Sequence, residues 1–165
     1  MEKDFHTVRG YENINSTRKL LTPSMEDYLE MIYRCSIEDE VVRLNKISQM
    51  LNVRDSSASK MMKKLGELAL INYEKYKVII LTEQGISLGK YLLNRHNIIE
   101  SFLQCLGGKE DILQETELIE HIISSETVEN IYILNSFLKD NVEILDKYKK
   151  FKENKINEIR LPKKI

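Results

Sequence analysis

The feature that most constrains the fold is a pair of short helical patterns joined by a tight turn. Apolar residues at helical spacing predict one helix over residues 44–51 and another over 54–65. The chain between them is so short that only a tight turn, centred on Asn52 and Val53, can connect them. Two short helices connected in this way are typical of a helix-turn-helix, in which the second helix enters the DNA major groove.

The second of these helices has one apolar face and one polar, basic face. Its apolar face consists of Ala58, Met61, Met62 and Leu65. We predict that Asp55 or Ser56 caps its start through a side-chain oxygen. Serines and lysines suit phosphates and base edges, but for this helix alone a solvated surface is favoured by about two to one.

Residues 71–81 favour the DNA-binding interpretation of this helix, because they contain two β-prone runs around a polar turn. This pattern predicts a β-hairpin, which would serve as a wing beside the helix-turn-helix. Residues 24–81 together therefore predict a winged helix-turn-helix that binds DNA. We expect DNA contacts from Ser56, Ser57, Ser59, Lys60 and Lys63, with Lys75 and Lys77 of the wing on phosphate.

The rest of the chain is predicted to be helical, so the fold class is mainly α. Thr22 and Pro23 signal a helix start, and that helix is expected to run to about Ser36. Further helices are predicted over 83–104, 110–123 and 126–139, with a basic terminal helix after residue 141. These later helices carry more apolar residues than the winged domain can cover, which indicates a homodimer.

Composition limits the classes of partner. The chain has 165 residues and a formal net charge of −1, so DNA binding must rely on local basic segments. Cys35 and Cys105 have no CxxC partner, which suits a reducing cytosol. Because no apolar run is long enough to span a bilayer, we expect a cytoplasmic protein with no membrane partner.

A second constellation combines carboxylates with histidines. Its members are Asp27, Glu30, His96, Glu117, Glu120 and His121. Glu117 and His121 are four residues apart, so a helix would place them on adjacent turns. Oxygen-rich sites with some imidazole suit Mn(II) or Fe(II), whereas closed zinc sites use thiolates. Taken alone, about four in five such clusters would be solvated surfaces.

Several motifs follow one another along the chain: Thr22–Glu30 (TPSMEDYLE), Ser56–Met61 (SSASKM), Tyr73–Tyr76 (YEKY), Leu81-Thr82, Arg95-His96 and Ile119–His121 (IEH). In this order they resemble the diphtheria toxin repressor family of metal-dependent regulators, and its manganese transport regulator branch in particular. The resemblance covers about residues 22–140. It implies a binuclear metal site whose ligands are the six residues of that constellation. The iron-sensing branch tends to place Met at position 27 and Cys at position 117, so the resemblance favours Mn(II).

These observations predict a homodimeric, Mn(II)-activated repressor of metal-uptake genes that binds a palindromic double-stranded operator. The alternatives are an Fe(II)-responsive regulator, a metal-independent winged-helix regulator, and a metal-dependent hydrolase. No convincing nucleophile or phosphate-binding glycine loop supports a hydrolase, so we expect no enzyme activity. The predicted domains are an N-terminal extension (1–21), the winged helix-turn-helix (22–82), a helical metal-binding and dimerisation domain (83–140) and a basic helix or tail (141–165).

Overall fold

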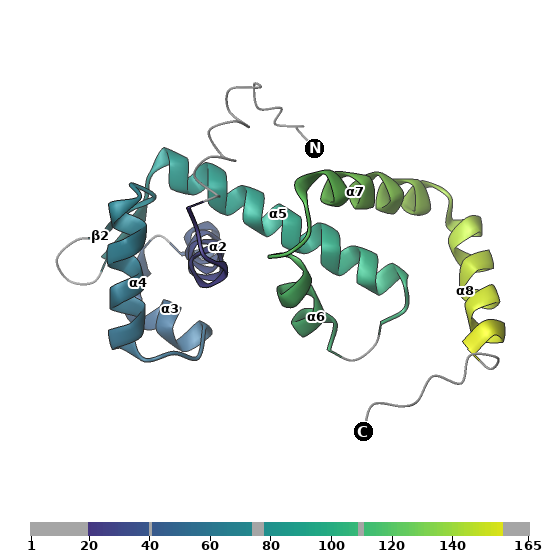
Figure 1. Ribbon diagram of the computed structural model, residues 1–165, viewed down its shortest axis with the longest axis horizontal. Helices are drawn as coiled ribbons and strands as arrows, with labels where there is room; N and C mark the ends of the chain where they lie inside the picture. Colours follow the sequence, from purple (N-terminus) through teal and green to yellow (C-terminus); the bar gives the residue numbers. More distant parts are fainter. Residues whose placement is uncertain (1–19, 40, 74–77, 109–110, 157–165) are drawn as a thin grey trace. The chain divides into compact units, whose positions relative to one another are not determined.

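The computed structural model of the chain describes residues 20–39, 41–73, 78–108 and 111–156. The chain divides into two compact units, one up to Asn94 and one from Arg95 onward, and each is described by itself. The division falls within the long helix α5 (Glu83–Cys105). As the sequence predicts, the fold is mostly helical with one small antiparallel sheet (Figure 1).

The first unit begins with α2 (Pro23–Glu38), at the position that the sequence predicts. Thr22 is the N-cap, and its Oγ1 accepts a hydrogen bond from the backbone N–H of Met25 at 3.4 Å. Pro23 takes the first helical position, where its missing N–H removes no intrahelical hydrogen bond. The helix runs two residues beyond the predicted end at Ser36.

The predicted helix-turn-helix is present as α3 (Leu44–Met50) and α4 (Asp55–Glu67). The turn depends on Asn52, whose φ of 51° lies in the left-handed region that Asn tolerates better than most residues. The backbone N–H groups of Asn52 and Val53 bond back to carbonyls of α3 and close its last turn in a Schellman motif. This geometry ends α3 and redirects the chain into α4.

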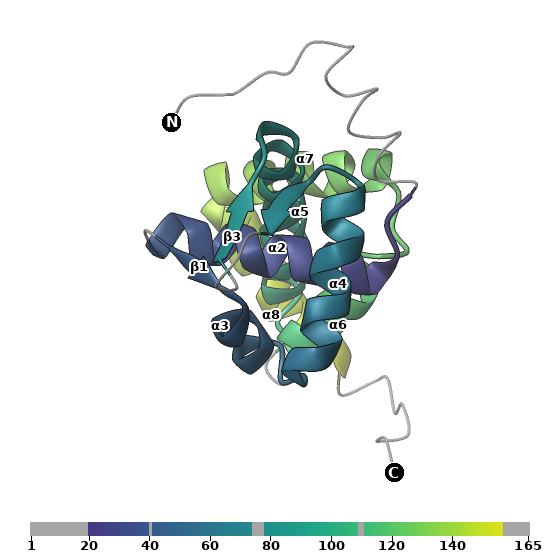
Figure 2. The ribbon, with the colours of Figure 1, turned by 90° about the vertical axis from the view of Figure 1, so that its left-hand side faces the viewer.

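The predicted hairpin is also present, as β2 (Ile71–Tyr73) paired antiparallel with β3 (Val78–Leu81). The residues at its tip, 74–77, lie outside the described part of the chain. A third strand, β1 (Val42–Arg43), pairs with the other edge of β3, and both strands are labelled in Figure 2. The strand order is therefore β1-β3-β2. The sequence does not predict β1, because two residues are too few to show an alternating pattern.

One apolar core holds this unit together. It is built from Met25, Tyr28, Leu29, Ile32, Cys35, Val42, Leu44, Ile47, Ala58, Met62, Leu65, Leu70, Ile71, Ile79, Leu88 and Leu92. At Gly89 of α5, an added Cβ would come within 2.6 Å of the Tyr33 Cβ on α2. A glycine is needed here, because only a residue without a side chain lets the two helices approach so closely.

The second unit contains the end of α5 and three further helices. They are α6 (Ile112–Ile119), α7 (Ser125–Asp140) and α8 (Val142–Ile156). Gly107, with a φ of 80°, ends α5 in another Schellman motif. Ser124 caps α7, and its Oγ accepts a hydrogen bond from the Thr127 N–H at 3.2 Å.

The prediction of a single helix over 110–123 is wrong at its C-terminal end. The helix ends at Ile119 with Glu120 as its C-cap, still at φ −60° and ψ −25°, and the chain then passes through a turn up to Ile122 and a bend at Ile123. Ser124 must be extended, with φ −73° and ψ 154°, in order to cap α7. The helical pattern of Ile122 and Ile123 therefore gives way to the geometry that the next helix start requires.

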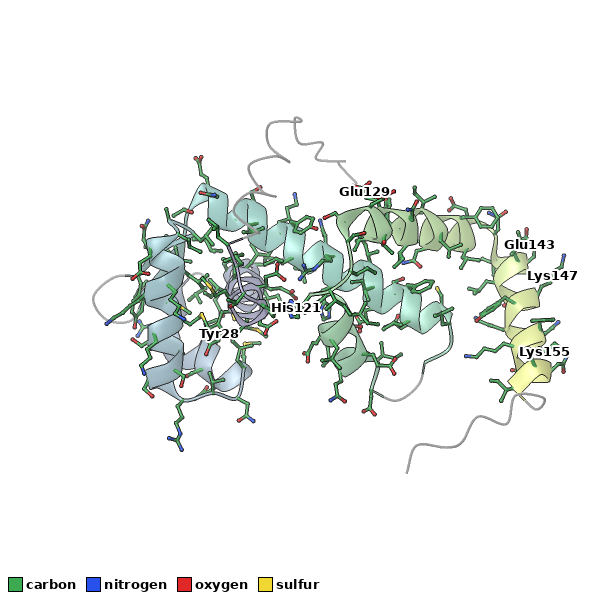
Figure 3. The ribbon with its side chains drawn as sticks, viewed as in Figure 1. Tyr28, His121, Glu129, Glu143, Lys147 and Lys155 are labelled. Carbon is green, nitrogen blue, oxygen red and sulfur yellow. The ribbon has the colours of Figure 1, made fainter. Side chains whose placement is uncertain are left out.

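Many apolar side chains of the second unit are exposed. They are Leu106, Leu113, Leu118, Ile122, Tyr132, Ile133, Leu134, Phe137, Val142, Ile144, Tyr148, Phe151 and Ile156. On α8 they alternate with lysines, and Lys147 and Lys155 are labelled in Figure 3. None of the described helices is long and apolar enough to cross a membrane.

Candidate metal centre and DNA-reading surface

The first unit supplies two of the predicted metal ligands from α2. Asp27 and Glu30 are three residues apart, so they lie on neighbouring parts of the helix surface. Glu30 is buried, with 6% of the residue exposed, and Asp27 is half-buried. Arg34 lies one turn further along, and its Nε and Nη2 both donate hydrogen bonds to Glu30 Oε1, at 2.9 and 2.7 Å. A buried carboxylate therefore faces a fixed positive charge within its own helix.

The second unit supplies a buried imidazole and a buried carboxylate. His96 of α5 and Glu120, at the C-cap of α6, are 4% and 2% exposed. His96 Nδ1 lies 2.9 Å from Glu120 Oε2. The other carboxylate oxygen, Glu120 Oε1, lies 3.8 Å from His121 Nε2. Both oxygens of one buried carboxylate thus face imidazole nitrogens from two segments of the chain.

Glu117 differs from these residues. It lies near the end of α6 and is exposed, whereas Glu120 and His121 follow the helix in the turn. The prediction that Glu117 and His121 occupy adjacent turns of one helix is therefore wrong. The part of the second unit that the structure describes brings His96, Glu120 and His121 together without Glu117. Its role as a ligand remains a prediction.

The residues gathered here fit a hard divalent cation. Burying a carboxylate is unfavourable unless a charge or hydrogen bonds compensate it, and Glu120 has only 2% exposure. Carboxylate and imidazole ligands suit Mn(II) and Fe(II). Both described cysteines, Cys35 and Cys105, are free thiols, and neither is among the described side chains that could hold a metal ion. The described side chains around Glu120 therefore offer carboxylate and imidazole donors of the kind that Mn(II) and Fe(II) accept.

The predicted DNA-reading residues lie mainly on the open side of α4. Ser56, Ser57, Lys60 and Lys63 are exposed and Ser59 is half-buried. The opposite side of α4 buries Ala58, Met62 and Leu65 in the core. Lys75 and Lys77, predicted on the wing, lie outside the described residues. The amphipathic character predicted for this helix is confirmed, while the individual DNA contacts remain predictions.

The start of α4 differs from the prediction and contains a link that the sequence did not reveal. Arg54 is the N-cap and makes no side-chain capping bond, so the prediction of a cap at Asp55 or Ser56 is wrong. Asp55 is the first helical residue, and its carboxylate accepts a hydrogen bond from the Ser48 hydroxyl of α3. Ser48 is 3% exposed, so this bond ties the two helices together inside the turn. Only the fold brings Ser48 and Asp55, seven residues apart, face to face.

Comparison with known proteins assigns both halves of the chain. Residues 20–79 match the iron dependent repressor N-terminal DNA binding domain. Residues 82–147 match the iron dependent repressor metal binding and dimerisation domain. The chain belongs to the iron dependent repressor family. The two domains of an iron dependent repressor imply DNA and a second copy of the chain as partners.

Named relatives agree with this assignment and are transcriptional regulators. The HTH-type transcriptional regulator MntR of Oceanobacillus iheyensis is 37% identical over 141 residues, which cover 83% of this chain and 96% of the relative. MntR of Bacillus pumilus is 39% identical over 125 residues, covering 75% and 87%. The family resemblance and the mainly helical fold predicted from the sequence are confirmed.

A solved structure of the manganese regulator SloR has the same fold. It superposes with a TM-score of 0.61 and is 35% identical. The match covers 72% of this chain and 55% of the SloR chain, so this chain spans about half the length of that regulator.

Proposed function

We propose that this iron dependent repressor is activated by Mn(II) and represses metal-uptake genes by binding a palindromic operator. The observation that carries the proposal is the buried His96–Glu120 pair, with His121 beside it, in the domain that matches a metal-binding domain. The relatives named MntR and the manganese regulator SloR support Mn(II) as the metal.

The proposed site is binuclear and takes ligands from both units. Its ligands are Asp27, Glu30, His96, Glu117, Glu120 and His121. When bound, Mn(II) supplies positive charge that offsets the repulsion among clustered carboxylates. Oxygen-rich ligands with some imidazole favour Mn(II) over zinc, and Fe(II) is the second candidate because it accepts the same ligand types.

Ligand placement then couples metal binding to DNA binding. Asp27 and Glu30 belong to the unit that carries α4, whereas His96, Glu120 and His121 belong to the other unit. Ligands from both units can bind the same metal only when the units adopt one arrangement. Without the metal, their carboxylates repel and the arrangement is not fixed. Such coupling is reciprocal and is typically about 1–3 kcal/mol in allosteric proteins.

DNA recognition is assigned to α4. Ser56, Ser57, Lys60 and Lys63 on its exposed side can donate hydrogen bonds to phosphates and base edges, and Ser59 can do so beside them. Lys75 and Lys77 of the wing would bind phosphate. In a homodimer, two such helices could enter successive major grooves about 34 Å apart, which is why a palindromic operator is proposed.

The test is DNA binding by the full chain, with genomic fragments selected in the presence of Mn(II). Fluorescence anisotropy would then compare binding of the selected fragment with Mn(II), Fe(II), Zn(II) and chelator. We expect Mn(II) to tighten binding by about 5- to 150-fold relative to chelator. Affinity that is equal with metal and with chelator would support a metal-independent winged-helix regulator instead.

A separate experiment tests whether Glu117 is a metal ligand. The family resemblance implies that the iron-sensing branch tends to place Cys at this position, so Glu117→Cys should shift preference away from Mn(II) and towards Fe(II) or Zn(II). The matched control is Glu115→Cys, an exposed change on the same helix. Unchanged metal preference in Glu117→Cys would contradict the assignment of Glu117 as a ligand.

A further inference from the structure

Arg34 forms an ion pair with one of the proposed metal ligands, and sequence motifs alone do not reveal it. Its guanidinium donates two hydrogen bonds to Glu30 Oε1, at 2.9 Å from Nε and 2.7 Å from Nη2. The Glu30 side chain is 8% exposed and the Arg34 side chain is 34% exposed. The Glu30 carboxylate is thus largely shielded from water, while the Arg34 guanidinium remains partly exposed to it.

The guanidinium in this ion pair always carries a positive charge. A guanidinium does not lose its proton in proteins, so Arg34 is positive at every physiological pH. A ligand carboxylate that already pairs with a cation is stabilised before any metal arrives. A divalent cation at Glu30 must therefore compete with Arg34 for the same negative charge.

We propose that Arg34 sets the metal concentration at which this regulator responds, by lowering the affinity of the site that contains Glu30. The inference rests on the proposed metal-binding function and deepens it. Arg34 lowers the free energy of the metal-free state through its pair with Glu30. In the metal-bound state, the same guanidinium is repelled by a cation with twice its charge.

The opposite role for Arg34 would be to orient Glu30 for the metal, so that its loss weakens binding. Two observations favour repulsion over orientation. Glu30 lies in the middle of α2 and is buried, so the helix and its packing already restrict its side chain. Repulsion between Arg34 and a cation at Glu30 is screened less than between two fully exposed charges, because the Glu30 side chain is 8% exposed, although Arg34 at 34% retains some contact with water.

The experiment is a direct Mn(II) titration of the DNA-free full chain, with free Mn(II) measured by electron paramagnetic resonance. Arg34→Met removes the charge and keeps an unbranched side chain, whereas Arg34→Gln removes the charge and keeps hydrogen-bond donors. Arg34→Lys keeps the charge without the planar fork. Arg43→Met is the matched control, because Arg43 is an exposed arginine of the same unit on β1.

We expect Arg34→Met and Arg34→Gln to bind Mn(II) at least about fivefold more tightly than the parent chain. Arg34→Lys and Arg43→Met should stay within about twofold of it. The Mn(II) concentration that half-saturates DNA binding should fall in parallel. Thermal unfolding in chelator checks that each variant is folded, and two neutral variants guard against a local effect of either one.

The proposal would be overturned if the Mn(II) affinity of both Arg34→Met and Arg34→Gln rose by less than about fivefold, or if either variant bound Mn(II) more weakly than the parent chain. An equal gain in Arg43→Met would also overturn it, because the effect would then follow total charge rather than the pair with Glu30. Failure of the proposed function is distinguishable, since the parent chain itself would then not bind Mn(II).

Discussion

The two units of the chain differ in how they bury their apolar residues. In the first unit, helices and sheet enclose one continuous core that includes Leu29, Ile32, Met62 and Leu65. Among the described residues of the second unit, the buried apolar side chains are Ile99 and Val128, while thirteen others are exposed on and around α6, α7 and α8. The first unit encloses a core even though seven of its large apolar residues are exposed, whereas most large apolar residues on the helices of the second unit remain open to another surface. This difference matches a reading domain joined to a dimerisation domain.

The largest expected effect is on the core of the first unit. Leu65→Ala should lower the free energy of unfolding by about 2–5 kcal/mol, because Leu65 is fully buried and a cavity would remain. Leu118→Ala in the second unit should lower it by about 0.5 kcal/mol or less in dilute protein, because Leu118 is 67% exposed. Urea unfolding measures both. Equal losses would contradict the contrast between the units.

The second effect concerns association. Ile133 on α7 is 63% exposed, and a charge there would be buried without a partner if a second copy covers it. Ile133→Asp should therefore weaken dimerisation by about a hundredfold. Ile37→Asp is the control, since Ile37 is 62% exposed in the first unit. Sedimentation velocity over a concentration series would separate them, and a dimer unaffected by Ile133→Asp would place the interface elsewhere.

The smallest effect concerns the two thiols, one in each unit. Burial raises the pKa of the Cys35 thiol, with smaller effects from the neighbouring charges of Lys46 and Asp39. A raised pKa favours the protonated thiol, so at mildly alkaline pH Cys35 carries less reactive thiolate than an ordinary cysteine. Cys105 is half-buried and should react with iodoacetamide at least about tenfold faster. Mass spectrometry of the labelled peptides would show it, and equal rates would mean that the first unit opens readily.

The sequence predicts most helices because their signals are local. Thr22 and Pro23 define the start of α2, and Gly107 with Gly108 defines the end of α5. The strand β1 was missed because its two residues owe their structure to pairing with β3. The end of α6 was misplaced because the extended geometry of Ser124, set by α7, overrides a helical pattern that continues to Ile123.

Residue types and motifs predicted which residues form the candidate site, but they did not predict the contacts among those residues. The pairing of His96 with Glu120 joins residues 24 positions apart, and only the fold reveals its distance of 2.9 Å. Arg34 lies four residues from Glu30, a spacing that permits an ion pair without requiring one. Asp55 looked like a cap, yet its partner is the buried Ser48 hydroxyl. Such contacts depend on tertiary structure that single-sequence patterns do not contain.

We propose that Glu30, in the first unit, and Glu120, in the second, are both metal ligands. The direct measurement is Mn(II) affinity of Glu30→Gln, in the first unit, and Glu120→Gln, in the second, with the exposed Glu67→Gln of α4 as control. Loss of outer-sphere partners alone weakens metal sites by 10- to 100-fold, so each ligand change should weaken binding by about a hundredfold or more. Glu67→Gln should bind as the parent chain does. Parent-like Mn(II) affinity in either ligand variant would contradict the account.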